Sequence, residues 1–539
     1  MELSLSPFFV FVYFFLTLIF IQLLIRVVAK PKSQTIELER PCRAPSPWKL
    51  PVIGHLHHLA LGGGVPHRTL HDLARRHGPL LHLRLGEVDH YVVSSPELAR
   101  EVLTTHDLAF ASRPALAATT VMCYGNTDIA FSPYGPYWRQ LRKICVVELL
   151  SAKRVRGFAA LREEEIARAL RGISSSASRV NLSERVYALA YAITSRAAFG
   201  AECRHLGRFE AAAKRAIKAG SGFAVADLFP SLGFLGALTG TSAGIERTHR
   251  ELDGIIEEII GEHEEKRERA KKKGEEGEGE GEGEEDLLDV LLRLKEEGVS
   301  FDSETPPLTR ENVKAVITPP HRVCVQDVFI AGTDTTATTL AWAMSELLRH
   351  PDAMAKAQSE LRRSLRGGGG AELRDEDVAS LRYTKLVVKE TLRLHPPLPL
   401  LLPRLAREPR RVGGHEIPAG SRVLVSAWAI GRDARRWGDD AEAFRPERFD
   451  EEGEGEGEGE GEKWMGFEHL AFGAGRRMCP GMGFGMASVE AALANLLCFF
   501  DWELPEGTEA GDLDMGELVG AVVGRRSDLW VVAIPYRPI

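Results

Sequence analysis

The stretch Phe472-Gly473-Ala474-Gly475-Arg476-Arg477-Met478-Cys479-Pro480-Gly481 decides how the rest of this chain is interpreted. A lone cysteine is usually a small buried apolar side chain. Here the cysteine ends a loop that carries two arginines and leads into a run typical of a helix. Both features lower the pKa of a thiol, so we expect Cys479 to be a thiolate that bonds a metal. Glycines 473, 475 and 481 are expected to permit tight bends and the close approach of a flat ligand.

A second informative stretch lies in a strongly helical run, Val323–His350, and reads Ala331-Gly332-Thr333-Asp334-Thr335-Thr336. Glycine and adjacent threonines are poor helix formers. A threonine hydroxyl can bond back to the carbonyl one turn earlier and bend the helix. Such a bend opens room for a small ligand and water, although the same residues alone fit an ordinary helix equally well.

Two further motifs place charged side chains on one helical face. Glu390 and Arg393 stand at i and i+3 within the largely apolar run Leu386–Leu394, which makes a buried ion pair plausible. Trp138 and Arg142 stand at i and i+4. An arginine fork can hold a carboxylate with two hydrogen bonds, so Arg142 is a candidate anion ligand, with an ordinary surface arginine as the alternative.

Taken in order, these stretches resemble the motifs of the cytochrome P450 family. Residues 472–481 match the heme-binding pattern F-G-x-G-x-R-x-C-x-G at every fixed position, and the E-x-x-R and W-x-x-x-R motifs are also present. Arg448, in Pro446-Glu447-Arg448-Phe449, matches the family's later arginine. The chain looks most like the large plant microsomal group that oxidises terpenoids, phenylpropanoids and alkaloids.

The resemblance implies a role for each matched residue around heme b (iron protoporphyrin IX). Cys479 would be the axial ligand of the iron, and Asp334 and Thr335 would guide protons and hydrogen bond dioxygen. The remaining cofactor-binding candidates comprise the first residue of the heme loop and the partners of the heme propionates: Phe472, Trp138, Arg142, Arg404 and Arg477. The trio of Glu390, Arg393 and Arg448 would hold the fold rather than take part in catalysis.

The implied reaction is monooxygenation of a hydrophobic small molecule by O2. No nucleotide-binding fingerprint is evident, so electrons would come from an NADPH–cytochrome reductase that docks near Cys479. Arg139, Lys143 and Arg476 are candidates for the docking charge. The pocket residues implied are mostly apolar: Tyr124, Phe223, Ala331, Pro397–Leu401 and Leu518–Ala521.

The substrate and even the reaction leave alternatives open. The apolar tract Phe223–Pro230 favours a sesquiterpene or diterpene over a phenylpropanoid or alkaloid. A heme-thiolate isomerase or dehydratase that needs no O2 is a second possibility, against which the intact Asp334-Thr335 pair argues. A heme-binding protein without catalytic activity is a third.

The amino terminus predicts a membrane anchor. Phe8–Ile25 has Thr17 and Gln22 as its clearly polar residues and would span about 27 Å as a helix. The leader carries no basic residue, and basic residues follow the run, which favours an uncleaved anchor in the endoplasmic reticulum membrane with the body in the cytosol. Pro41–Pro51 resembles the proline-rich hinge of microsomal relatives.

We therefore expect an anchor over residues 1–30, a hinge over 31–51 and one catalytic domain over 52–539. The fold class is mainly α with a minor β-sheet region (α+β). The expected strands are Leu81–Leu85, His90–Ser94, Arg422–Ala427 and Leu529–Ile534, and an amphipathic helix is expected over His71–His77. Thr318–Val325 interrupts the pattern before the long helix, and we interpret it as unremoved intron sequence or an inserted loop.

Composition excludes several classes of protein. The net charge of -8 comes from two tracts, Glu275–Glu285 and Glu451–Glu462, with seven glutamates each; without those fourteen charges it would be +6. Alternating Glu and Gly cannot bury apolar surface, so both tracts are expected to be disordered. Basic residues are scattered, which argues against a nucleic-acid partner. The seven cysteines are widely spaced and form no C-x-x-C pair, as expected in a reducing compartment.

Overall fold

The computed structural model describes residues 43–536, apart from 177–178, most of 201–223, 235, 237–239, 274–285, 297–322, 369–372, 452–466, 468, 519 and 521. The predicted anchor, the tract Glu275–Glu285, all but the first residue of the tract Glu451–Glu462 and most of the interruption at 318–325 lie outside the described residues. Residues 43–539 belong to one compact unit.

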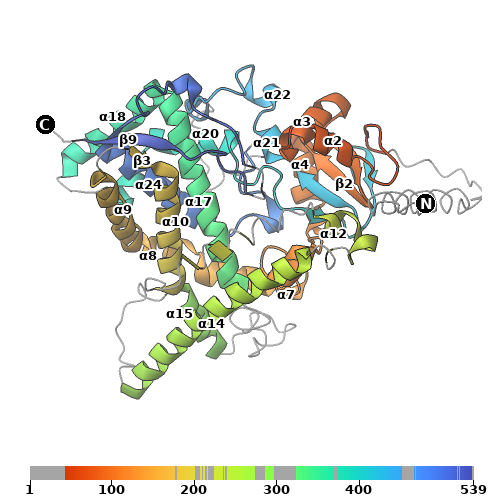
Figure 1. Ribbon diagram of the computed structural model, residues 1–539, viewed down its shortest axis with the longest axis horizontal. Coiled ribbons are helices and arrows are strands. Elements are labelled where there is room, and N and C mark those ends of the chain that lie inside the picture. Colours follow the sequence, from red (N-terminus) through yellow and green to blue (C-terminus); the bar gives the residue numbers. More distant parts are fainter. Residues whose placement is uncertain are drawn as a thin grey trace, which may run out of the picture. The chain divides into compact units, whose positions relative to one another are not determined.

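Helices dominate the described residues, as the sequence predicted (Figure 1). They are α2 (Leu56–Leu61), α3 (Pro66–His77), α4 (Pro96–Arg100), α5 (Asp107–Phe110), α6 (Ala117–Met122), α7 (Pro136–Ile144), α8 (Ala152–Gly157), α9 (Ala159–Ser174), α10 (Leu182–Phe199), α12 (Val225–Leu228), α14 (Thr241–Lys273), α15 (Leu287–Glu296), α17 (Val323–Arg349), α18 (Pro351–Gly368), α19 (Asp375–Ala379), α20 (Tyr383–Leu394), α21 (Ala427–Ile430), α22 (Ala434–Trp437), α23 (Arg448–Glu451) and α24 (Met482–Phe499).

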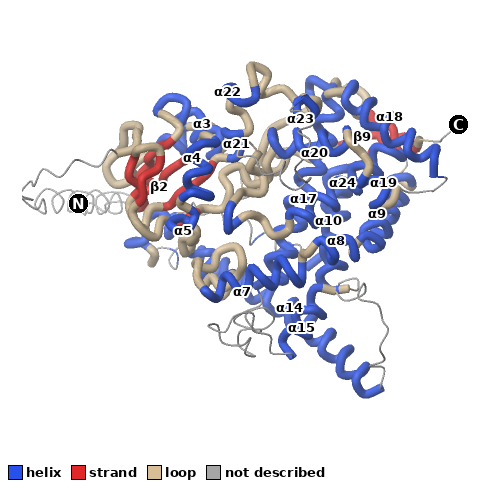
Figure 2. The backbone as a smooth tube through the Cα atoms, turned by 180° about the vertical axis from the view of Figure 1, so that it is seen from behind, coloured by secondary structure: helices blue, strands red, loops and turns tan. Residues whose placement is uncertain are grey.

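The strands form three small sheets. They are β1 (Leu80–Leu85), β2 (Val88–Val93), β3 (Arg179–Asn181), β4 (Arg404–Leu405), β5 (Arg410–Val412), β6 (His415–Ile417), β7 (Arg422–Val425), β8 (Phe500–Glu503) and β9 (Trp530–Pro535). The strand orders are β1-β2-β7-β4, β3-β9-β8 and β5-β6. Figure 2 shows β2 in red, separate from the blue helices around α17 and α24.

The four predicted strands are confirmed, with shifts of one or two residues at their ends. β1 and β2 pair antiparallel around Gly86, which has φ 62°, and β7 lies parallel to β2 with His90 opposite Arg422. The helix expected from His71 begins earlier, at Pro66. Proline is favoured in the first turn of a helix, and its neighbours His67 and Arg68 carry too little apolar character to reveal that turn from the pattern.

The core is built around α17, which packs against α10, α20 and α24. Among the described residues, α24 has the length and apolar composition of a membrane span, but 67% of it is buried inside the protein. Its most deeply buried side chains, such as Leu493 and Leu497, belong to the main apolar cluster. We therefore identify α24 as a core helix. Its first residue lies three positions after Cys479, so the core fixes the helix that follows the cysteine loop.

Candidate active site

The cysteine loop is held by backbone bonds and by glycine. The Cys479 N–H donates to the Phe472 carbonyl at 2.9 Å, which closes the loop on itself. Gly473 and Gly475 both have φ 69°. A Cβ on Gly475 would lie 1.9 Å from the Leu103 carbonyl oxygen, so glycine is required there. Gly481 has φ -91° and ψ 11° and lies in the turn that leads from the loop into α24, of which it is the N-cap.

The electrostatic surroundings of Cys479 differ from the prediction. Burial raises the pKa of the Cys479 thiol, while the Gly481 N–H and the charge of Arg142 oppose that rise. The prediction that both neighbouring arginines lower this pKa was wrong. Arg476 turns to Asp107, with Nη1 3.0 Å from Oδ2, and Arg477 donates to backbone carbonyls. The arginine that acts on the sulfur comes from α7.

Helix α7 carries both Trp138 and Arg142, in agreement with the helix predicted from their i, i+4 spacing. Trp138 is buried, and its Nε1–H donates to the Ile129 carbonyl at 3.0 Å. Arg142 is half-buried, and no carboxylate or hydrogen-bond acceptor among the described residues pairs with it. Burial lowers its pKa, and interactions with Cys145 and Cys479 oppose that change. A half-buried guanidinium without a partner fits a bound anion.

Arg404 and Arg477 lie in the same region. The Arg477 guanidinium stands 4.1 Å from the centre of the Trp138 ring. Arg404 donates to Asp107 Oδ1 at 3.2 Å and to the Ala474 carbonyl at 3.1 Å. Burial lowers the pKa of Arg404 to about 10, and burial together with the charge of Arg404 lowers that of Arg477 to about 9.

Arg113 is a site residue that the sequence analysis missed. It is 7% exposed and donates to the carbonyls of Ala130, Leu402 and Pro403. Burial lowers its pKa well below the usual range, and the charges of Arg404 and Arg477 lower it further. The only signal in the sequence was an arginine before a proline, which gives no hint that the fold gathers three arginines here.

The charges in this region do not balance within the described residues. Arg113, Arg404 and Arg477 lie beside the buried carboxyl groups of Asp107 and Asp128, and Asp107 also pairs with the exposed Arg476. Since Arg142 has no carboxylate partner among the described residues, positive charge is in excess here. Buried charges require partners. Heme carries two propionates, and the glycine-lined loop beside Cys479 offers a close approach for its flat face. The residues present therefore fit heme.

Helix α17 carries the predicted Asp334 and Thr335, both half-buried. The Thr335 hydroxyl donates to the Ala331 carbonyl at 2.6 Å, the back-bonding that the sequence predicted. A Cβ on Gly332 would lie 3.3 Å from Thr194 of α10 and 4.0 Å from the Phe484 ring of α24. The glycine thus lets α17 pack closely against α10, while Phe484 of α24 lies in ordinary contact with the same position.

The predicted fold-holding trio is confirmed. Glu390 is fully buried and accepts both Nε and Nη2 of Arg393 at 2.7 Å. Arg448 Nε donates to the same carboxylate at 2.9 Å. Arg393 also donates to the carbonyls of Gly431 and Ala441, which fixes the segments before the heme loop.

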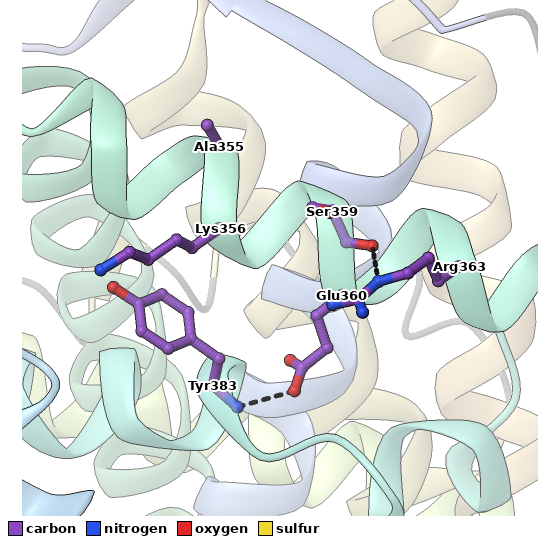
Figure 3. Close-up of a pocket in the computed structure, with 6 residues that line it drawn as sticks. All are labelled: Ala355, Lys356, Ser359, Glu360, Arg363 and Tyr383. Atoms are coloured by element: carbon purple, nitrogen blue, oxygen red, sulfur yellow. Dashed lines mark hydrogen bonds between the residues drawn. The ribbon is translucent and has the colours of Figure 1, made fainter.

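Figure 3 shows a surface hollow of about 490 Å³ on α18, beside the start of α20. Its lining is polar and comprises Ala355, Lys356, Ser359, Glu360, Arg363 and Tyr383. Glu360 Oε1 accepts the backbone N–H of Tyr383 at 2.8 Å and so caps α20. None of the predicted site residues lines this hollow, and its groups serve the fold.

Three side chains of types that can ligate a metal join α14 to α15: His263, Asp286 and Asp289. His263 Nδ1–H donates to the Ile259 carbonyl, and Nε2 lies 3.0 Å from Asp286 Oδ2. Burial opposes protonation, but the hydrogen bond and charge of Asp286 raise the pKa of His263. An ion pair with protonated His263 therefore accounts for this cluster.

Comparison with known proteins identifies the class that this fold and site define. The cytochrome P450 family profile matches residues 44–529, so the chain belongs to the cytochrome P450 family. Family membership implies a heme cofactor, O2, a redox partner and a hydrophobic substrate.

Individual relatives are similar over nearly their whole length. Premnaspirodiene oxygenase from Hyoscyamus muticus is 47% identical over 98% of both chains. Germacrene A hydroxylase from Barnadesia spinosa is 46% identical over 96% of both. A zebrafish cytochrome P450 structure with progesterone has a TM-score of 0.69 at 24% identity and covers 87% of this chain and 99% of that one, which supports the fold.

Proposed function

We propose that this cytochrome P450 inserts one oxygen atom from O2 into a terpenoid, with electrons from NADPH delivered by a membrane-bound cytochrome reductase. Three relatives support the substrate class by their names: premnaspirodiene oxygenase, germacrene A hydroxylase and 5-epiaristolochene 1,3-dihydroxylase, at 44–47% identity. The observation that carries the proposal for the site is the excess of positive charge beside a cysteine loop that glycine keeps open.

Heme b is the proposed cofactor, with Cys479 as its iron ligand. Arg113, Arg142, Arg404 and Arg477 would neutralise its two carboxylates, with Trp138 packed against Arg477. Heme held by a cysteine thiolate supplies dioxygen activation, because the thiolate donates electron density that favours O–O cleavage.

The proposed proton transfer uses two residues of α17, Asp334 and Thr335. The Thr335 hydroxyl proton is committed to the Ala331 carbonyl, so its oxygen lone pairs remain available to accept a hydrogen bond from a water. Asp334 stands beside it on α17 and is half-buried, as a group that exchanges protons with solvent must be. We assign Thr335 to holding that water and Asp334 to supplying the proton.

The proposed substrate pocket is bordered by segments that the structure connects to the cysteine loop. Leu401 Cδ1 lies 3.7 Å from the position of a Cβ on Gly473, and Leu401 has the strained φ of 50°. The Val523 N–H donates to the Pro397 carbonyl at 2.9 Å, which ties the C-terminal loop to the same segment. Apolar groups around a single reactive centre suit a hydrocarbon substrate.

The proposed cellular arrangement follows from the termini and the surface. Residues 1–30 would anchor the chain in the endoplasmic reticulum membrane, residues 31–51 would form the hinge, and residues 52–539 the catalytic domain in the cytosol. Arg139, Lys143 and Arg476 are exposed and would offer positive charge to an acidic reductase surface.

The test is turnover in microsomes that contain the full-length chain and its reductase. Sesquiterpene and aromatic substrates are supplied under heavy-isotope oxygen gas, and products are analysed by mass spectrometry. One labelled oxygen atom in a terpenoid product is the expected result. An unlabelled rearranged product would identify an isomerase or dehydratase, and labelled products from aromatic substrates alone would reject the terpenoid assignment.

The metal ligand is tested by Cys479→Ser, with Cys498→Ala as the matched control because Cys498 is a buried cysteine of α24. The Ser variant should lose turnover and the red-shifted band of the reduced, carbon-monoxide-bound spectrum. The control should keep both. Retained turnover in Cys479→Ser would refute the assignment of the sulfur.

A further inference from the structure

The turn formed by residues 128–132, here called the Asp128 turn, supplies acceptors to several of the proposed heme ligands. The Ile129 carbonyl accepts Trp138 Nε1–H at 3.0 Å and Arg477 Nη1–H at 3.3 Å. The Ala130 carbonyl accepts Arg113 Nε–H at 3.0 Å, and the Ser132 carbonyl accepts Arg477 Nη2–H. Two arginines and a tryptophan from separate segments are thus oriented by one short piece of backbone.

Asp128 stabilises this turn by accepting two hydrogen bonds from residues within it. Its Oδ1 accepts the Phe131 N–H at 3.1 Å, and its backbone carbonyl accepts the Ser132 N–H at 3.2 Å. This side-chain bond to the backbone three residues ahead fixes the direction of the carbonyls between them. The three residues from Tyr124 to Asn126 all have positive φ, so the chain enters the turn through a constrained path.

Burial of the Asp128 carboxyl group without full hydrogen bonding costs free energy, which indicates that the group has a specific role. Asp128 is 0% exposed, and its Oδ2 has no hydrogen-bond partner among the described residues. Burial raises its pKa to about 6, although bonds from Phe131 and Cys123 and the charge of Arg477 oppose the rise. A fully buried carboxyl without complete pairing is uncommon in a purely structural role.

We propose that Asp128 is a positioning residue for heme: through Oδ1 it holds the Asp128 turn so that Trp138, Arg113 and Arg477 face the propionates. The inference rests on the proposed function, since it assigns those three side chains to heme. It makes the acceptor at Oδ1, rather than the charge of the carboxyl group, the essential feature.

The test compares Asp128→Ala with Asp128→Asn in the full-length, heme-loaded protein. Asparagine keeps an oxygen that can accept the Phe131 N–H, whereas alanine does not. Heme release to apomyoglobin should be about tenfold faster in the Ala variant and within about twofold of the wild type in the Asn variant. The propionate bending bands of the resonance Raman spectrum should shift only in the Ala variant.

Asp286→Ala is the matched control. Asp286 is also buried, and its Oδ1 accepts the N–H of Asp289, three residues ahead, but it caps α15 and contacts none of the proposed heme ligands. This variant should lose stability without faster heme release or shifted Raman bands. Equal heme release from the two alanine variants would mean that faster release reflects a general loss of stability, and it would overturn the proposal.

If Asp128→Ala does not fold, Asp128→Ser takes its place in the test. Asp128→Ser offers a weaker cap than asparagine, so it should release heme faster than Asp128→Asn; equal rates would overturn the proposal. A wild-type protein without the heme-thiolate spectrum would refute the proposed function itself. A normal wild-type spectrum with unchanged release in Asp128→Ala would refute this inference alone.

Discussion

Two groups of arginines in this protein differ in charge balance: carboxylates of the chain balance the first, and the second has an excess of positive charge. Around Glu390, the buried cations Arg393 and Arg448 meet the buried carboxylate of Glu390 and the exposed carboxylate of Asp440, which also pairs with the exposed Arg445. Around Trp138, the buried Arg113, Arg404 and Arg477 lie beside Asp107 and Asp128, and Asp107 is shared with the exposed Arg476. Arg142, also in this group, has no partner among the described residues. The first group is complete within the chain, and the second requires a ligand.

This difference in charge balance separates arginines that stabilise the fold from arginines that bind a ligand. Both groups use the same residue type, and both are built from segments distant in sequence. Neither burial nor the number of hydrogen bonds distinguishes them, since Arg113 and Arg477 also donate to several carbonyls. What distinguishes them is the count of carboxylates, because a buried excess of charge is stable only when a further ion compensates it.

The largest expected effect comes from Glu390→Gln, which would break the balanced group. It leaves two buried guanidinium groups with one carboxylate fewer, and removal of one partner of a buried pair costs about 3–5 kcal/mol. Thermal unfolding of the detergent-solubilised protein should show this loss with or without heme. Glu447→Gln is the control from the same region, since its partner Lys356 is exposed and such surface pairs contribute little to stability. Equal losses in the two variants would contradict the comparison.

A smaller effect is expected at Glu517, whose ion pair closes the C-terminal loop onto α3. Burial alone would raise its pKa, but hydrogen bonds and charge from His67 and Arg68 hold it at about 2. Because this folded-state pKa lies below that of an unfolded glutamate, the stabilisation is present above about pH 4 and is lost as the pH falls toward 2.

Glu517→Gln should therefore lower the free energy of unfolding by about 2 kcal/mol at pH 7. The difference from the wild type should shrink below about pH 4 and vanish near pH 2. Urea unfolding at a series of pH values measures it. A difference that stays constant across that range would show that packing, not charge, ties this loop to α3.

A different result is expected for Arg142→Met, which changes the group with excess positive charge. Since no described residue pairs with Arg142, the heme-free protein should change in unfolding free energy by less than about 1 kcal/mol, or gain stability because a buried charge is removed. Heme release should accelerate about tenfold, because a propionate loses its partner. Arg393→Met is the contrast and should destabilise the protein whether or not heme is bound. A large stability loss in heme-free Arg142→Met would place Arg142 with the fold-holding group.

The sequence predicted the fold through features that repeat or stand close together. The alternation around Gly86 gave β1 and β2, and the i, i+3 spacing of Glu390 and Arg393 gave the buried pair, since both depend on local geometry. Recognition of the family then assigned Arg448 to that pair. The start of α3 was misplaced because Pro66 begins the helix before its apolar face becomes visible in the pattern.

The candidate site was predicted less completely, because it depends on contacts between distant segments. Arg113 could not be identified, since its importance arises only where it meets Arg404 and Arg477. The influence of Arg476 and Arg477 on Cys479 was wrongly predicted from their proximity in sequence, because side-chain direction rather than spacing decides which charge a sulfur experiences.

Thr335→Ala tests a residue that shares features of both groups. Its hydroxyl donates to the Ala331 carbonyl within the chain, and we propose that it also holds a water molecule. Back-bonding of a threonine hydroxyl to the carbonyl one turn earlier does not stabilise a helix, so its removal should cost little stability. It should instead uncouple turnover, so that NADPH is consumed several-fold faster than product forms and hydrogen peroxide accumulates. Thr339→Ala is the control, since Thr339 donates to the Thr335 carbonyl in the same way one turn later and is buried. If both variants uncouple equally, bending of α17 rather than a held water sets the coupling, and Thr335 belongs with the fold-holding residues.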